Sequence, residues 1–146
     1  MRDKLRILFL CTGNSCRSQM AEGFARALKG DRIEPYSAGV VSQGLNRRAV
    51  QSMAAAGVDI SNQRSKIVDS LLDIPFDYVV TVCSHAHETC PLFPGKSRII
   101  HADFDDPPTL TKGWTDENAI ARVYNRVRDQ IRAYIQTLPD ALTQQR

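Results

Sequence analysis

The sequence predicts an α/β fold, a single domain in which a four-stranded parallel sheet is flanked by helices on both faces. Short apolar runs ending in turn residues, typical of buried strands, alternate with segments whose apolar residues recur at helical spacing. This alternation indicates βαβ units, in which the strands run parallel and the helices cover the sheet. A chain of 146 residues suffices for one hydrophobic core, so we expect one domain over 1–146.

Each predicted element rests on its own local pattern. The strands are predicted at residues 5–10, 32–39, 76–83 and 96–102, and the helices at 18–30, 46–57, 65–73 and 116–138. Pro35 favours an edge position for the second strand, because proline cannot donate to a ladder on both sides. Thr115 is the predicted N-cap of the last helix, and the tail after Pro139 is expected to be frayed.

The last helix has a clear apolar face. The residues predicted to form it are Ile120, Val123, Val127, Ile131, Tyr134 and Ile135.

Composition excludes several classes of function. The net charge is only +3 and the basic residues are scattered, so no nucleic-acid partner is expected. No apolar stretch is long enough for a membrane span and the N-terminal apolar run is too short for a signal peptide, which predicts a cytoplasmic protein. The four cysteines should be reduced there, which makes them candidates for catalysis or metal binding. We expect a monomer that needs no cofactor.

The loop after the first strand has the composition of an anion-binding site. It reads CTGNSCRS from Cys11 to Ser18, and the next helix begins at its end. Successive N–H groups at a helix N-terminus cradle an oxyanion, and the guanidinium of Arg17 supplies a planar set of donors. In that field the Cys11 thiol can become a nucleophilic thiolate, with Ser18 hydrogen-bonded to its sulfur. The predicted oxyanion-binding residues are Thr12, Gly13, Asn14, Ser15, Cys16 and Arg17.

Other phosphate-binding loops do not fit. The chain has neither G-x-x-x-x-G-K-[ST] nor a G-x-G-x-x-G after a strand, so neither a Walker loop nor a dinucleotide-binding motif is supported. A buried small side chain would explain Cys11 alone, but it would not explain the residues that follow.

The loop resembles that of low-molecular-weight protein tyrosine phosphatases, and it is closer to the thioredoxin-coupled arsenate reductases of the same fold. YSAG (36–39), DISN (59–62), TVCSHAHETCP (81–91) and FDDP (104–107) follow in the order and spacing of those reductases. The resemblance therefore spans nearly the whole chain. It implies reduction of arsenate to arsenite, with hydrolysis of phosphomonoesters through a Cys11 phosphoenzyme as the alternative.

The resemblance also assigns the general acid. Departure of oxygen from arsenate or phosphate needs a proton donor, and by resemblance this donor is Asp106 rather than its neighbour Asp105. An ordinary Asp-Pro turn is the other interpretation of this segment. Pro108 and Thr109 stand where the phosphatases of the family tend to carry aromatic residues, which weakens the tyrosine-phosphatase interpretation.

Three interpretations of CSHAHETC (83–90) remain open. The cysteines are incidental, or Cys83, His85, His87 and Cys90 bind zinc, or the cysteines form a redox relay. By resemblance, Cys83 attacks arsenylated Cys11, Cys90 then attacks Cys83, and thioredoxin reduces the Cys83–Cys90 disulfide. Cys16 either packs in the loop or protects Cys11 by reversible disulfide formation.

Some reductases of this kind bind potassium behind the loop, and this chain departs from their pattern. Asn14, Glu22 and Ser37 match the potassium-binding residues, but Lys66 stands where an aspartate is expected. The ammonium group of Lys66 either occupies the place of the ion or points to solvent. We predict that the protein does not need potassium. Trp114, in a segment longer than the family loop, either covers the edge of the core or lines the site.

Overall fold

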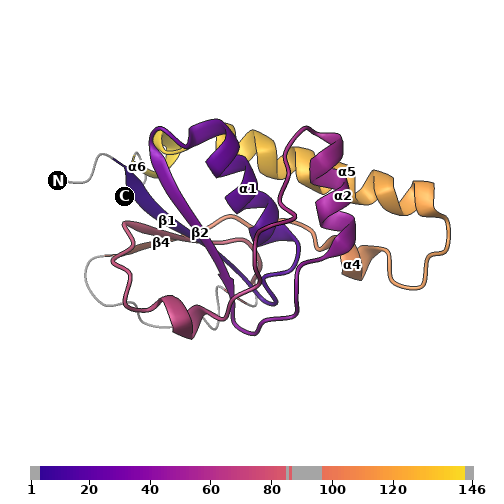
Figure 1. Ribbon diagram of the computed structural model, residues 1–146, viewed down its shortest axis with the longest axis horizontal. Helices are drawn as coiled ribbons and strands as arrows, with labels where there is room; N and C mark the ends of the chain where they lie inside the picture. Colours follow the sequence, from indigo (N-terminus) through magenta and orange to yellow (C-terminus); the bar gives the residue numbers. More distant parts are fainter. Residues whose placement is uncertain (1–3, 85, 87–96, 144–146) are drawn as a thin grey trace.

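Four parallel strands form the centre of the computed structural model, in the order β2-β1-β3-β4 across one sheet (Figure 1). They are β1 (Leu5–Cys11), β2 (Ile33–Gly39), β3 (Tyr78–Thr81) and β4 (Arg98–His101). The structure describes residues 4–84, 86 and 97–143. The predicted fold class is confirmed. β2 pairs only with β1 within the sheet, which places Pro35 at an edge as predicted.

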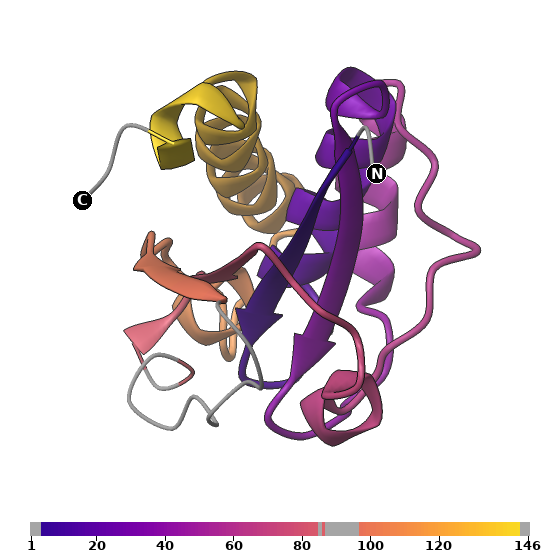
Figure 2. The same ribbon diagram turned by 90° about the vertical axis from the view of Figure 1, so that its left-hand side faces the viewer.

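The helices lie in layers around the sheet. They are α1 (Arg17–Lys29), α2 (Arg47–Ala55), the 3-10 turn η1 (Val68–Leu71), α4 (Pro107–Leu110), α5 (Glu117–Gln136) and α6 (Asp140–Thr143). α1 packs against β1, β2 and α5, and α2 packs against α5. In Figures 1 and 2, α1, α2 and α5 lie on one side of the sheet, whereas η1 lies on the other.

Three element predictions need correction. The N-cap of α5 is Asp116 rather than Thr115, because the Asp116 carboxylate accepts hydrogen bonds from the N–H groups of Asn118 and Ala119. The segment predicted as a helix over 65–73 forms only the four-residue turn η1. The predicted frayed tail contains α6, whose Leu142 is buried in the core.

The buried face of α5 also differs slightly from the prediction. Ile120, Val127, Ile131 and Ile135 are buried as expected. Tyr124 is buried as well, whereas Val123 and Tyr134 are only partly covered, because α2 packs over the Tyr124 side of the helix.

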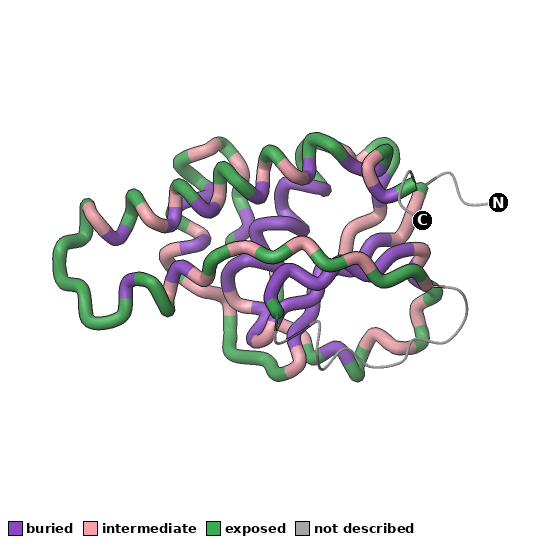
Figure 3. Tube along the Cα trace, turned by 180° about the vertical axis from the view of Figure 1, so that it is seen from behind, coloured by how far each residue is buried: buried purple, intermediate pink, exposed green. Residues whose placement is uncertain are grey.

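The carboxyl ends of the strands, where the predicted site residues lie, are at one edge of the sheet. β1 is almost completely buried, and its register with its neighbours places Cys11 opposite Gly39 and Leu10 opposite Thr81. Because all four strands are parallel, their carboxyl ends meet on one side, where the connecting loops converge. Figure 3 shows the buried segments at the centre of the molecule and the exposed connection between α4 and α5 at one end.

Candidate active site

The loop between β1 and α1 adopts a tight conformation that its sequence explains. Asn14 has a φ of 51°, a left-handed conformation that asparagine tolerates better than most residues. Gly13 lies under the side chain of Gln43: a Cβ at position 13 would come within 2.1 Å of Gln43 Oε1. A larger residue would therefore displace Gln43 from the loop.

This loop forms the floor of a cavity of about 520 Å³. Of the predicted site residues, Cys11, Thr12, Gly13, Ser15, Cys16, Arg17 and Asp106 line it. The cavity walls also contain Gln43, Asn46, Pro108 and Thr109. Gln43 and Asn46 were missed by sequence reasoning, because they belong to the connection between β2 and α2, which carries no motif. Its approach to the loop rests on hydrogen bonds from Gln43 N to Gly13 O and from Asn46 N to Ser15 O, both 2.9 Å.

Arg17 begins α1 and is almost fully buried beside the thiols. Its Nη1 donates to the carbonyl oxygen of Phe104 (2.9 Å), and its Nη2 lies 3.5 Å from Asp106 Oδ1. Its Nε is buried with no hydrogen-bond partner in the structure. Burial works against the charged form, but the neighbouring Cys11 and Asp106 outweigh it and raise the pKa of Arg17. The guanidinium is therefore a permanent positive charge whose buried Nε has a donor to spare.

The two adjacent carboxylates, Asp105 and Asp106, have different surroundings. The Asp106 side chain is 33% exposed, lines the cavity and accepts a hydrogen bond from Thr109 Oγ1 at 2.6 Å. The Asp105 side chain is 60% exposed and lies 3.8 Å from Arg126 on α5. Of the two, only Asp106 reaches the cavity that contains Cys11.

Cys11 and Cys83 lie together although 72 positions separate them in the sequence. A hydrogen bond joins their thiols. Cys83 Sγ is also 3.2 Å from Thr12 Oγ1, and it accepts the N–H of Ala86 at 3.4 Å. These donors favour a negative charge on Cys83. The hydrogen bond from Cys11 is the largest cause that lowers the pKa of Cys83 to about 5.

The interaction with Cys83 shifts the pKa of Cys11 in the opposite direction. Because Cys11 donates the shared hydrogen bond and is buried, its pKa is raised well above the ordinary value, although Arg17 opposes this. This interaction therefore favours a negative charge on Cys83, whereas the loop chemistry alone predicts it at Cys11. The sequence could not reveal this, because the second thiol comes from another strand.

Two predicted loop residues, Asn14 and Ser18, act within the loop rather than at the cavity surface, and Cys16 is buried beside them. Asn14 Nδ2 donates to Ser18 Oγ (2.9 Å), and Asn14 Oδ1 accepts from Gln19 and from the backbone N–H of Lys66. Ser18 is fully buried, and its bond to the Cys11 sulfur remains a prediction. Burial raises the pKa of Cys16 far above its usual range, which makes it a neutral thiol at rest.

Behind the loop, Lys66 points inward rather than to solvent. Its ammonium donates to Arg64 O (2.6 Å) and lies 3.8 Å from Glu22 Oε1. Glu22 also accepts from Ser37 Oγ (2.5 Å) and pairs with Arg26 (2.7 Å). Burial lowers the pKa of Lys66, and the Glu22 carboxylate partly offsets this. A tethered cation thus lies beside Glu22, one of the residues that match a potassium site.

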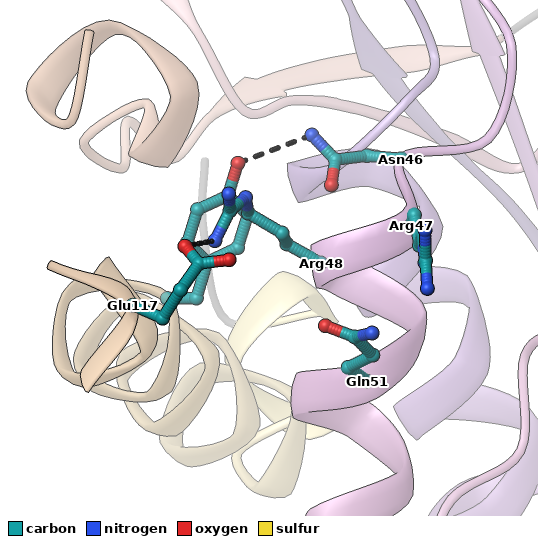
Figure 4. Close-up of a pocket in the computed structure, with 6 residues that line it drawn as sticks. Asn46, Arg47, Arg48, Gln51 and Glu117 are labelled. Atoms are coloured by element: carbon teal, nitrogen blue, oxygen red, sulfur yellow. Dashed lines mark hydrogen bonds and ion pairs between the residues drawn. The ribbon is translucent and has the colours of Figure 1, made fainter. Parts of the chain in front are cut away.

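A second cavity, of about 390 Å³, borders the first at Asn46 (Figure 4). Arg48 of α2 and Glu117 of α5 point toward one another there and form an ion pair of 2.7 Å. Asn46 Nδ2 donates to the hydroxyl of Tyr124 (3.2 Å). These contacts fasten α2 to α5 and so hold one wall of the Cys11 cavity.

Part of the sequence prediction lies outside the described residues. Cys90, His85 and His87 are among the residues that the structure does not describe, so neither the relay through Cys90 nor the zinc interpretation is tested. Within the described ranges no group of three or more histidine, cysteine, aspartate or glutamate side chains could hold a metal ion. Trp114 is 47% exposed and lines a shallow hollow on α5 with Arg122 and Arg126, away from Cys11.

Comparison with models of known protein families shows to which family the chain belongs. The model of the low molecular weight phosphotyrosine protein phosphatase family matches residues 6–146. The chain belongs to this family. Within the described residues no helix is long and apolar enough to cross a bilayer.

The more similar relatives include arsenate reductases. The chain is 49% identical over 131 residues to an arsenate reductase of Bacillus subtilis, covering 90% of this chain and 91% of the relative. It is 46% identical over 138 residues to an arsenate reductase of Halalkalibacterium halodurans, covering 94% and 97%.

Solved structures with this fold include both activities. An arsenate reductase in the phosphate binding state superposes with a TM-score of 0.73 at 28% identity, covering 92% of this chain and 95% of that one. A low molecular weight protein tyrosine phosphatase from T. tengcongensis gives 0.71 at 27% identity, covering 94% and 98%. The resemblance seen in the sequence motifs is confirmed.

Proposed function

We propose that this protein reduces arsenate to arsenite with a relay of three cysteines, Cys11, Cys83 and Cys90. The observation that carries the proposal is the adjacency of two thiols beside the Arg17 guanidinium: the sulfur of Cys83 lies 3.2 Å from Oγ1 of Thr12, the residue that follows Cys11, at the cavity that Cys11 and Arg17 line. A phosphatase needs only the first cysteine, because water completes its reaction. The arsenate reductases at 46–49% identity and at least 90% coverage support the same assignment.

The first step joins Cys11 to arsenic. The backbone N–H groups of residues 12–17 and the guanidinium of Arg17 hold the oxyanion over the Cys11 sulfur. The shared hydrogen bond gives the Cys11 proton a path to Cys83, which leaves the thiolate on Cys11. This thiolate attacks arsenic while an arsenate oxygen departs as water, taking a proton from Asp106. Arsenic is still pentavalent at this stage.

The second step transfers two electrons. The Cys83 sulfur attacks the Cys11 sulfur, its proton passes to the departing arsenic oxyanion, and the electron pair of the sulfur–arsenic bond passes to arsenic. Arsenic is reduced from As(V) to As(III) and leaves as arsenite, and the two thiols become a Cys11–Cys83 disulfide. Thr12 and the N–H of Ala86 hold the Cys83 sulfur in position for this attack.

The third step returns the site to its starting state. Cys90 attacks Cys83, which frees Cys11 as a thiolate and forms a Cys83–Cys90 disulfide. We assign its reduction to thioredoxin in the cytoplasm, on the resemblance to thioredoxin-coupled reductases, with the protein acting as a monomer. Because the oxyanion loop also accepts phosphate, weak hydrolysis of phosphomonoesters is expected beside the main reaction.

The test is turnover with arsenate, thioredoxin, thioredoxin reductase and NADPH. Wild-type protein should consume NADPH continuously, and Cys83→Ser should stop after forming the Cys11 adduct. Cys16→Ser is the matched control, because it removes a buried cysteine of the same loop that the relay does not use. Sustained turnover by Cys83→Ser would overturn the relay, and the absence of turnover in wild type with any dithiol reductant would overturn the reductase assignment.

A further inference from the structure

We propose that Thr109 is a positioning residue that determines which oxygen of Asp106 carries the proton. The inference rests on the proposed function, in which Asp106 protonates the departing oxygen, and it adds a residue that the sequence motifs do not assign. Thr109 lines the cavity that contains Cys11 and Arg17.

The two oxygens of the Asp106 carboxyl group have different neighbours. Oδ2 accepts the hydroxyl proton of Thr109 at 2.6 Å, a short hydrogen bond even for a charged acceptor. Oδ1 lies 3.5 Å from Nη2 of Arg17. One side of the carboxyl group is therefore fixed to α4, and the other faces the guanidinium that would bind the oxyanion.

This difference determines which oxygen of Asp106 carries the proton that is donated to the departing oxygen. An oxygen that accepts the hydroxyl of Thr109 is held as an acceptor, so the proton of a neutral carboxyl group resides on Oδ1. Oδ1 is the oxygen on the side of Arg17, where the departing oxygen would lie. Without the Thr109 hydroxyl only the longer contact of 3.5 Å with Arg17 orients the carboxyl group, and a proton on Oδ2 would point away from the oxyanion.

The backbone alone would not fix this orientation. Asp106 is the N-cap of α4, but its side chain makes no capping hydrogen bond to the backbone. Arg17 holds Asp106 only at 3.5 Å, and its Nη1 is occupied by Phe104 O. The hydroxyl of Thr109 is thus the closest hydrogen-bond donor that the structure gives this carboxyl group.

A single-turnover experiment tests the inference without any external reductant. Fully reduced protein is mixed with increasing arsenate, and the arsenite formed per chain gives a maximal rate and a half-saturating concentration. Thr109→Val removes the hydroxyl but keeps the shape, and we expect about a tenfold lower maximal rate with half-saturation changed less than twofold, within the span of general acid catalysis. Thr109→Ser retains the hydroxyl and should restore most of the rate.

Two further variants separate positioning from structure. Thr111→Val removes the hydroxyl that donates to Pro107 O in the same short helix, and it should leave the rate within about twofold. In an Asp106→Asn background, Thr109→Val should cause no further loss, because the hydroxyl acts only through the acid.

Equal losses from Thr109→Val in both backgrounds, a comparable loss from Thr111→Val, or no loss at all would overturn the inference. Wild-type rates in Asp106→Asn would instead refute the assignment of the acid itself, so the two failures are distinguishable.

Discussion

At the scale of single residues, the pair Cys11 and Cys83 controls the chemistry, because two adjacent thiols cannot both ionise at neutral pH. Cys83 receives hydrogen bonds from Cys11, Thr12 and Ala86, which favours its thiolate. The same interaction, with burial, raises the pKa of Cys11 and so favours its protonated form. The nucleophile of the first step is therefore stored in protonated form beside its own proton acceptor.

This arrangement predicts how Cys11 responds to pH when Cys83 is changed. The hydrogen bond to Cys83 is the largest cause that raises the pKa of Cys11. In Cys83→Ser that cause is lost while Arg17 remains, so the pKa of Cys11 should fall. The midpoint of its alkylation by iodoacetamide should move to lower pH by at least about one unit, which corresponds to about 1.4 kcal/mol.

Mass spectrometry of the peptide that contains Cys11 measures this shift. Cys16→Ser serves as the control, since Cys16 is absent from the causes that shift Cys11. An unchanged or higher midpoint in Cys83→Ser would refute the shared-proton description.

Lys66 gives a second prediction at this scale. Its ammonium lies 3.8 Å from the buried Glu22 carboxylate, where it supplies a positive charge from within the chain. Arsenate turnover should therefore be the same in KCl and NaCl at equal ionic strength. Lys66→Ala should lower turnover in NaCl, and potassium should restore part of the loss. A several-fold activation of the wild-type protein by potassium would contradict this prediction.

At the scale of elements, short polar connections rather than the helices themselves shape the cavity. The connection between β2 and α2 brings Gln43 and Asn46 over the loop, and the N-cap and first turn of α4 bring Asp106 and Thr109. α5 supports both, because it packs against α2 and α4. The position of α5 therefore affects the cavity although α5 contributes no residue to it.

The N-cap of α5 gives a prediction for stability. Asp116 accepts hydrogen bonds from two N–H groups at the start of the helix, whereas Thr115 does not cap it. Asp116→Ala should lower the free energy of unfolding by about 1 kcal/mol in urea denaturation, with Thr115→Ala within about 0.3 kcal/mol of wild type. A larger effect of Thr115→Ala would show that the cap lies one residue earlier.

At the scale of the whole molecule, much of the fold could be predicted because its strands and helices follow from local sequence patterns. The strand that ends at Cys11, the edge position marked by Pro35 and the helix that starts at Arg17 each follow from a few neighbouring residues. Thr115 and Asp116 are both good caps, and only the direction in which the chain enters α5 decides between them.

The part of the site that lies in one continuous segment could be predicted from the sequence. Cys11 and Arg17 lie in one loop, whereas Asp106 was assigned by resemblance to the family, because its Asp-Pro context alone also fits an ordinary turn. The contact of Thr12 with Cys83 depends on where separate elements come together in space. Such contacts depend on tertiary structure, which no pattern within one segment encodes.

The central claim is that arsenate is reduced by electrons from Cys11 and Cys83, and one measurement tests it most directly. Reduced Cys90→Ser protein is mixed with excess arsenate, and arsenite, free thiols and disulfides are measured after one turnover. The account predicts one arsenite per chain, the loss of two thiols and a Cys11–Cys83 disulfide in the peptide map. Arsenite formed without that disulfide, or no arsenite at all, would contradict it.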